Sequence, residues 1–141
     1  MQIKEAMTKE IRSISSTATV KDAALLMKQS DVGALPVMEQ GGLSGMITDR
    51  DIVVRAIAEG SDPNSILVKD IMSTDVLTCR EDQPLEEVAS LMESKKVRRI
   101  VVLNRKNEPA GIISLGDLAA HAQRELAGEA LKQVSEPVHS K

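Results

Sequence analysis

The 141-residue sequence contains no phenylalanine, tyrosine or tryptophan. Proteins that bind single-stranded nucleic acid stack the bases on aromatic side chains, and this chain also carries a formal net charge of −3, so nucleic acid is not the expected partner. Any base bound here must lie between aliphatic side chains and be recognised by backbone groups. The core must be built from Ile, Leu, Val, Ala and 7 methionines.

Metal-binding and redox residues are equally scarce. The single cysteine, Cys79, excludes an internal disulfide and a cysteine-based zinc site, and is consistent with a protein of the reducing cytoplasm. The two histidines, His121 and His139, lack the spacing of a metal-binding pair on a helix. We therefore expect no metal site and a cytoplasmic location.

Long hydrophobic runs are also missing. No stretch approaches the roughly 20 apolar residues of a membrane span, and the first ten residues contain no apolar stretch of signal-peptide length. With 42% hydrophobic and 28% charged residues, the composition is that of a globular protein rather than a disordered chain. The sequence predicts neither a membrane segment nor secretion by that route.

Two diverged copies of one unit make up most of the chain, at a spacing of about 65 residues. Met7 and Thr8 recur as Met72 and Ser73. Later segments recur in the same way: residues 26–27 match 91–92, 35–37 match 100–102, 45–48 match 111–114, and 51–52 match 117–118. A unit of about 60 residues buries too little apolar surface to be stable alone, so we expect the copies to pack with pseudo-two-fold symmetry.

Each copy has the pattern of a β-α-β-β-α unit, which predicts an α/β (α+β) fold with two tandem repeats. Thr19 followed by Asp22 is a capping-type helix start, and Pro84 opens the corresponding helix. The expected strands are 11–14, 35–38 and 43–48 in the first copy and 76–79, 100–103 and 110–114 in the second. The expected helices begin at 20 and 85, and a second helix in each copy occupies 51–58 and 117–130. The expected organisation is a domain at 3–59, a linker at 60–68, a domain at 69–125, and a helical tail at 126–141 that stops at Pro137.

A motif, Gly-x-Ile-[Thr/Ser]-x-x-Asp, occurs at residues 45–51 and 111–117, where a strand passes into a helix in each copy. One interpretation is purely structural: Thr48 and Ser114 are helix N-caps, and Asp51 and Asp117 complete capping boxes. The other is a ligand site. An aspartate can accept hydrogen bonds from a ribose diol, while the hydroxyl, the helix N–H groups and a nearby cation can hold phosphate.

Basic residues that could serve phosphate lie close to these motifs. Lys95, Lys96, Arg98 and Arg99 form the densest cluster, which is either a solvated loop or a phosphate-facing patch. Arg50 either reaches phosphate or pairs with a neighbouring aspartate. No P-loop, dinucleotide fingerprint or nucleophile with an oriented base is present, so we do not expect an enzyme.

The doubled unit resembles a pair of CBS domains, named after the regulatory domain of cystathionine β-synthase and also called a Bateman module. The residues that carry the resemblance are Met7 and Thr8, the segments 32–37 and 45–51, and their partners in the second copy. The resemblance extends over about residues 3–125. It implies two clefts between the paired domains, in which many members of the family bind adenosine nucleotides.

For one cleft, the resemblance implies Ser114 and Asp117 against phosphate and ribose, with Val32 and Gly33 against the adenine. Arg99 stands where nucleotide-binding relatives often carry a basic residue, and is a phosphate candidate. For the second cleft it implies the other copy of the motif opposite residues 97–98. The full candidate set is Thr48, Asp51, Ser114, Asp117, Arg99, Arg98, Val32, Gly33, Val97, Arg50 and Thr8.

The function implied is a non-catalytic regulatory sensor that binds AMP, ADP or ATP between the repeats, signals to an unknown effector protein and forms a homodimer through its amphipathic helices. It requires no cofactor. Two alternatives stay open: a structural or interaction dimer with no bound nucleotide, and a module for another adenosyl ligand such as S-adenosylmethionine or NAD.

Overall fold

The computed structural model describes residues 2–9 and 11–135, with side chains as far as residue 128. The helix stop expected at Pro137 and the second histidine, His139, lie outside the described residues. The first half contains β1 (Ile14–Ser15), α1 (Val20–Ser30), β2 (Ala34–Glu39), β3 (Gly42–Thr48), α2 (Asp49–Asp51) and the π-helix η2 (Ile52–Ile57). The second half contains β4 (Thr78–Arg80), α4 (Leu85–Lys95), β5 (Arg99–Leu103), β6 (Pro109–Ser114) and α5 (Leu115–Ser135). The expected β-α-β-β-α order is confirmed twice.

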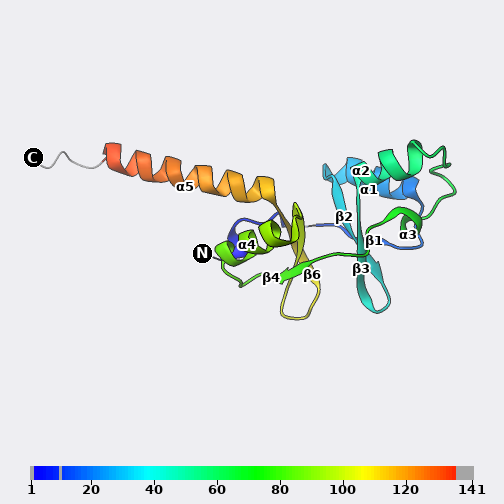
Figure 1. The fold of residues 1–141 in the computed structure, drawn as a ribbon, viewed down its shortest axis with the longest axis horizontal. Coiled ribbons are helices and arrows are strands. Elements are labelled where there is room, and N and C mark those ends of the chain that lie inside the picture. Colours follow the sequence, from blue (N-terminus) through cyan, green and yellow to red (C-terminus); the bar gives the residue numbers. More distant parts are fainter. Residues whose placement is uncertain (1, 10, 136–141) are drawn as a thin grey trace, which may run out of the picture.

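Each half is built on a three-stranded sheet, in the orders β1-β2-β3 and β4-β5-β6. In both sheets the first pair is parallel, with the helix as its crossover, and the second pair is an antiparallel hairpin. The two sheets stand beside each other in the middle of the molecule, and helices lie outside them (Figure 1).

The first strand of each half is shorter than expected and begins later. β1 pairs with β2 only through Ile14 and Ser15, and the expected strand start at Ile11 instead packs between the two halves. Val76 does the same in the second half, where β4 begins at Thr78. In both copies, residues with strand-like sequence therefore lie outside the sheet, because their side chains pack between the two repeats.

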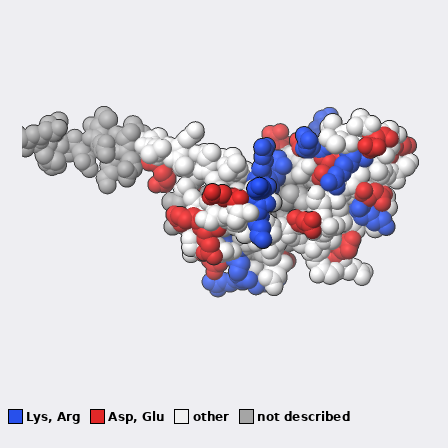
Figure 2. Space-filling model, in the orientation of Figure 1, with Lys and Arg blue, Asp and Glu red and all other residues white. Residues whose placement is uncertain are grey.

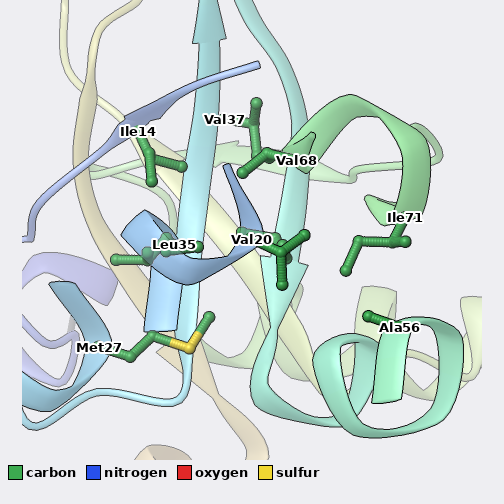
Figure 3. Packing of buried hydrophobic residues seen from close by; sticks show 10 residues of the cluster. Ile14, Val20, Met27, Leu35, Val37, Ala56, Val68 and Ile71 are labelled. Atoms are coloured by element: carbon green, nitrogen blue, oxygen red, sulfur yellow. The ribbon is translucent and has the colours of Figure 1, made fainter. Parts of the chain in front are cut away.

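Alternation along the strands gives each sheet two buried faces. In β2, Leu35 and Val37 pack on α1 within the core of the first half (Figure 3), and in β5, Ile100 and Val102 belong to the second core. A third cluster lies between the halves and contains Ala34, Met46, Val101 and Ile112. The sheet faces that do not meet helices therefore meet each other, which confirms the expected packing of one copy on the other.

The segment before each repeat completes the core of the other repeat. The short helix η1 (Ile3–Glu5) places Ile3, which is 0% exposed, in the core of the second half. The short helix α3 (Val68–Ile71) places Val68 and Ile71 in the core of the first half. Neither core is thus formed by one contiguous stretch of sequence.

The last helix, α5, leaves the body of the molecule and projects into solvent (Figure 1). Its first turns are anchored by Leu118 and His121, which are buried, whereas residues 122–128 are exposed. The helix starts directly after the cap at Ser114, two residues before the expected 117, and continues through Gly128 into the expected helical tail as far as Ser135, because no proline interrupts it. No helix in the described part of the chain has the length and apolar character needed to cross a bilayer.

Candidate ligand-binding site

Both copies of the motif form the capping box that the sequence allows. Thr48 N donates to Asp51 Oδ2 at 2.9 Å, and Asp51 N donates to Thr48 Oγ1 at 3.1 Å. Ser114 N donates to Asp117 Oδ2 at 2.9 Å, and Asp117 N donates to Ser114 Oγ at 3.0 Å. The structural interpretation of the motif is therefore confirmed. Each cap uses one oxygen of its aspartate, Oδ2.

The glycine of the motif allows a second backbone segment to approach the strand. A Cβ on Gly111 would lie 2.6 Å from the Thr8 carbonyl oxygen, and a Cβ on Gly45 would lie 2.5 Å from that of Ser73. This close approach is made by the Met-[Thr/Ser] segment of the other repeat. It fixes Thr8 at the edge of a cavity between the halves.

That cavity has a volume of about 230 Å³ and is lined from both repeats. Six residues of the candidate set meet there: Thr8, Val32, Gly33, Arg99, Ser114 and Asp117. They come from the N-terminal segment, the turn before β2, the start of β5 and the strand–helix junction of the second motif. Residues distant in sequence are therefore brought to one hollow by the packing of the repeats.

Five further residues of the cavity wall were not among the candidates: Ile11, Arg12, Asp31, Ala34 and Ile112. Ala34 and Ile112 lie inside recognised motifs, whereas the other three lie outside them, so the sequence carried a signal only for Ala34 and Ile112. Ile11, Ala34 and Ile112 also belong to the apolar cluster between the halves, so the cavity has an aliphatic side. Arg12 and Asp31 add one charge of each sign.

A second hollow of about 490 Å³ adjoins the first and shares Arg99 and Ser114 with it. Its other lining residues are Arg98, Leu115, Gly116 and Ala119. These six residues include two guanidinium groups and no carboxylate, so this hollow favours anions. Figure 2 shows Lys and Arg side chains gathered in a band near the middle of the molecule, where the two halves meet.

The remaining candidates lie elsewhere. Val97 and Arg98 share a hollow of about 540 Å³ on the side of α4 and α5. Thr48, Arg50 and Asp51 line none of these three hollows, and Arg50 is exposed. The second cleft, expected between the first copy of the motif and residues 97–98, stays a prediction.

The single thiol is buried, and the described residues contain no cluster of metal-ligating side chains. Burial raises the pKa of the Cys79 thiol to about 11, so it is not an activated nucleophile. No group of three or more His, Cys, Asp or Glu side chains is placed to hold a metal ion within residues 2–9 and 11–128. His121 Nε2 lies 3.8 Å from Glu125 Oε1 in a pair on α5.

Comparison with known proteins identifies the family. The CBS domain model matches residues 3–57 and 68–124. The chain is 41% identical over 134 residues to the CBS domain-containing protein YhcV of Bacillus subtilis, covering 94% of each sequence.

Two solved structures illustrate the likeness in three dimensions. The CBS domain pair of protein MJ0100, in complex with 5′-methylthioadenosine and S-adenosyl-L-methionine, superposes with a TM-score of 0.76 at 25% identity, covering 89% of this chain and 98% of that one. Hypoxic Response Protein I with two coordinated zinc ions superposes with a TM-score of 0.72 at 30% identity, covering 86% of this chain and 98% of that one. The resemblance seen in the sequence is confirmed: the chain belongs to the CBS domain family and folds as a CBS domain pair.

Proposed function

We propose that this chain is a non-catalytic sensor that binds an adenosine nucleotide in the cavity between its repeats and passes the signal to a partner protein. The observation that carries the proposal is the convergence of Val32 and Gly33 from one repeat with Arg99, Ser114 and Asp117 from the other on a single cavity. The set combines an aliphatic wall, a carboxylate, a hydroxyl and a cation, which are the groups that an adenosine phosphate requires.

The parts of the ligand match different parts of the wall. Adenine fits the aliphatic side formed by Val32, Ala34 and Ile112, which suits a chain with no aromatic side chain for stacking. The ribose hydroxyls fit Asp117, whose second carboxylate oxygen is not used by the helix cap. Phosphate fits the side of Arg99, where the adjoining hollow adds a second guanidinium.

The adenosyl class as a whole is supported by the MJ0100 domain pair, whose structure holds 5′-methylthioadenosine and S-adenosyl-L-methionine. We favour an anionic nucleotide for this chain because S-adenosylmethionine carries a net positive charge, whereas the adjoining hollow is lined by the guanidinium groups of Arg98 and Arg99 and by no carboxylate. A panel that contains both kinds of ligand distinguishes them.

A homodimer is part of the proposal. Leu25 on α1 is 42% exposed, and Val53, Val54 and Ile57 on η2 are 60%, 44% and 54% exposed. These four apolar side chains lie on helices on the outside of the first half (Figure 1). Exposed apolar side chains on outer helices favour association with a second copy.

The function is tested by thermal unfolding with AMP, ADP, ATP, 5′-methylthioadenosine, S-adenosylmethionine and NAD. A ligand present at a hundred times its Kd adds about 2.7 kcal/mol to the free energy of unfolding. We expect the adenosine phosphates to raise the Tm of the wild type. We expect Asp117→Asn to abolish the rise, because it removes the charge that accepts the ribose hydroxyls.

The matched control is Asp22→Asn. Asp22 forms the same capping box with Thr19, with N–O distances of 3.3 and 3.1 Å, but lies on α1 outside the cavity. Both variants weaken a helix cap, so both lower the Tm without ligand, and only Asp117→Asn removes the ligand response. If no nucleotide stabilises the wild type, the motif serves only as a helix cap and the chain is a structural dimer.

A further inference from the structure

The two copies of the motif differ in the residue that lies four positions after the aspartate. In the first copy this residue is Arg55, whose Nε lies 3.8 Å from Asp51 Oδ1. The other oxygen, Asp51 Oδ2, accepts the backbone N–H of Thr48 at 2.9 Å. Both carboxylate oxygens of Asp51 therefore have a partner within the protein.

Arg55 is also held from outside its own helix. Its Nη1 donates to the carbonyl oxygen of Ile71, at the end of α3, at 3.2 Å. The side chain of Asp51 is 13% exposed and that of Arg55 is 53% exposed, so the guanidinium lies on the solvent side of a largely buried carboxylate. A ligand hydroxyl that approached Asp51 would have to displace this group.

In the second copy the corresponding residue is His121, and it pairs with a different carboxylate. His121 is 8% exposed, and its Nε2 lies 3.8 Å from Glu125 Oε1, one turn further along α5. Asp117 Oδ2 accepts the N–H of Ser114, and no hydrogen bond or ion pair to Asp117 Oδ1 is present among the described residues. This free oxygen belongs to a residue of the cavity wall.

The helices that follow the two aspartates are wound differently. After Asp51 the chain forms the π-helix η2, which carries Arg55 toward α3, whereas Asp117 lies in the continuous α-helix α5. Local π-helical winding is uncommon in proteins and frequently marks functional positions. The difference in winding accompanies the difference in the partner of each aspartate.

We propose that Arg55 closes the first-half site, so that one chain binds one adenosyl ligand, at Asp117. The inference rests on the proposed function, since it concerns the same ligand class. A ribose that bound Asp51 would break the contact of Arg55 with the carboxylate and leave the Ile71 carbonyl without its donor, which makes the first-half site the weaker of the two. At Asp117 a ribose breaks no such contact.

The experiment is isothermal titration of the full chain with ATP, and separately with S-adenosylmethionine, to count ligands per chain. The wild type should bind one molecule of whichever probe binds. Arg55→His places at this position the residue that the second copy carries, and it should raise the count to two. Arg55→Gln, which removes the charge but keeps a polar side chain, should do the same if the imidazole is not tolerated. Adding Asp51→Asn to either variant should return the count to one.

Arg124→His is the matched control, because Arg124 is an exposed arginine of α5 outside the cavities, and it should leave the count at one. A wild type that binds two ligands per chain overturns the inference and leaves the proposed function intact. A count that stays at one in both folded Arg55 variants also overturns it. If neither probe binds the wild type, the proposed function fails, and the inference fails with it.

Discussion

Thr8 and Ile112 exchange two backbone hydrogen bonds, with N–O distances of 2.9 and 3.1 Å, although they lie near opposite ends of the chain. Ser73 and Met46 form the same pair in the other half, both at 2.9 Å. Each Met-[Thr/Ser] segment is thus attached to the motif of the other repeat. The segment that begins one repeat therefore lies against the motif of the other repeat, and in this way Thr8 comes to line the candidate cavity.

Gly111→Ala should disturb this attachment. The added Cβ would lie 2.6 Å from the Thr8 carbonyl oxygen and 2.7 Å from Met7 Sδ, so the segment must shift. We expect a loss of about 1–3 kcal/mol in the free energy of unfolding, measured by urea denaturation. The control is Gly128→Ala, where a Cβ has no neighbour within 4 Å; this helical position should gain about 0.5–1 kcal/mol. Equal effects at the two glycines would contradict the close approach.

Ile3→Ala should be strongly destabilising although Ile3 lies almost at the start of the chain. The side chain is 0% exposed within the core of the second half, and its N–H donates to the Gln83 carbonyl at 2.9 Å. Truncation leaves a cavity and should cost about 2–5 kcal/mol. Lys4→Ala, a change at an exposed side chain next to it, should have little effect. A negligible cost at Ile3 would show that the second core does not depend on the N-terminal segment.

The stability of the protein should fall at alkaline pH through Cys79. Burial raises the pKa of its thiol from 9.0 to about 11 in the folded state. The contribution that the protonated thiol makes to the free energy of unfolding is fully present below about pH 9, and it is lost as the pH rises through about 11. Comparing urea unfolding of the wild type and Cys79→Ala across this range isolates the effect, because the variant has no thiol. A stability difference that does not change with pH would contradict this prediction.

Ile57→Lys should convert the proposed dimer to a monomer. Ile57 is 54% exposed beside other apolar side chains of η2, so a buried interface there would not accept an ammonium group. The measurement is sedimentation equilibrium, with circular dichroism to confirm that the helices remain. Leu126→Lys is the comparison, since Leu126 is 72% exposed on the projecting part of α5. A dimer that survives Ile57→Lys and dissociates with Leu126→Lys would place the interface on α5 instead.

Much of the fold could be predicted because its helices and strands follow from local sequence patterns, and these patterns occur twice. Short apolar runs predicted β2 and β5, and the capping residues predicted the helix starts after Thr48 and Ser114. The strand starts were less predictable. Ile11 and Val76 have strand-like side chains, but the sheet register that excludes them depends on contacts between the repeats.

The candidate cavity was predictable where a residue lies inside a repeated motif, as Ser114 and Asp117 do. It was not predictable for Arg12 or Asp31, which lie outside the motifs and reach the cavity only through the packing of the two halves. The spacing of four residues between Asp51 and Arg55 is itself a sequence signal for an ion pair on a helix. The contact of Arg55 with the Ile71 carbonyl was not predictable, because it depends on how α3 packs beside the helix.

The amino-acid sequence by itself determined that this protein is a doubled unit, which helices and strands each unit contains, and which side chains cap the helices, because these depend on interactions between residues close together in the chain. Tertiary structure alone decided that the segment before each repeat completes the core of the other, and that the two motifs end in unequal surroundings. Those outcomes depend on contacts between residues far apart in sequence. Two similar motifs do not by themselves indicate which distant residue will contact each of them.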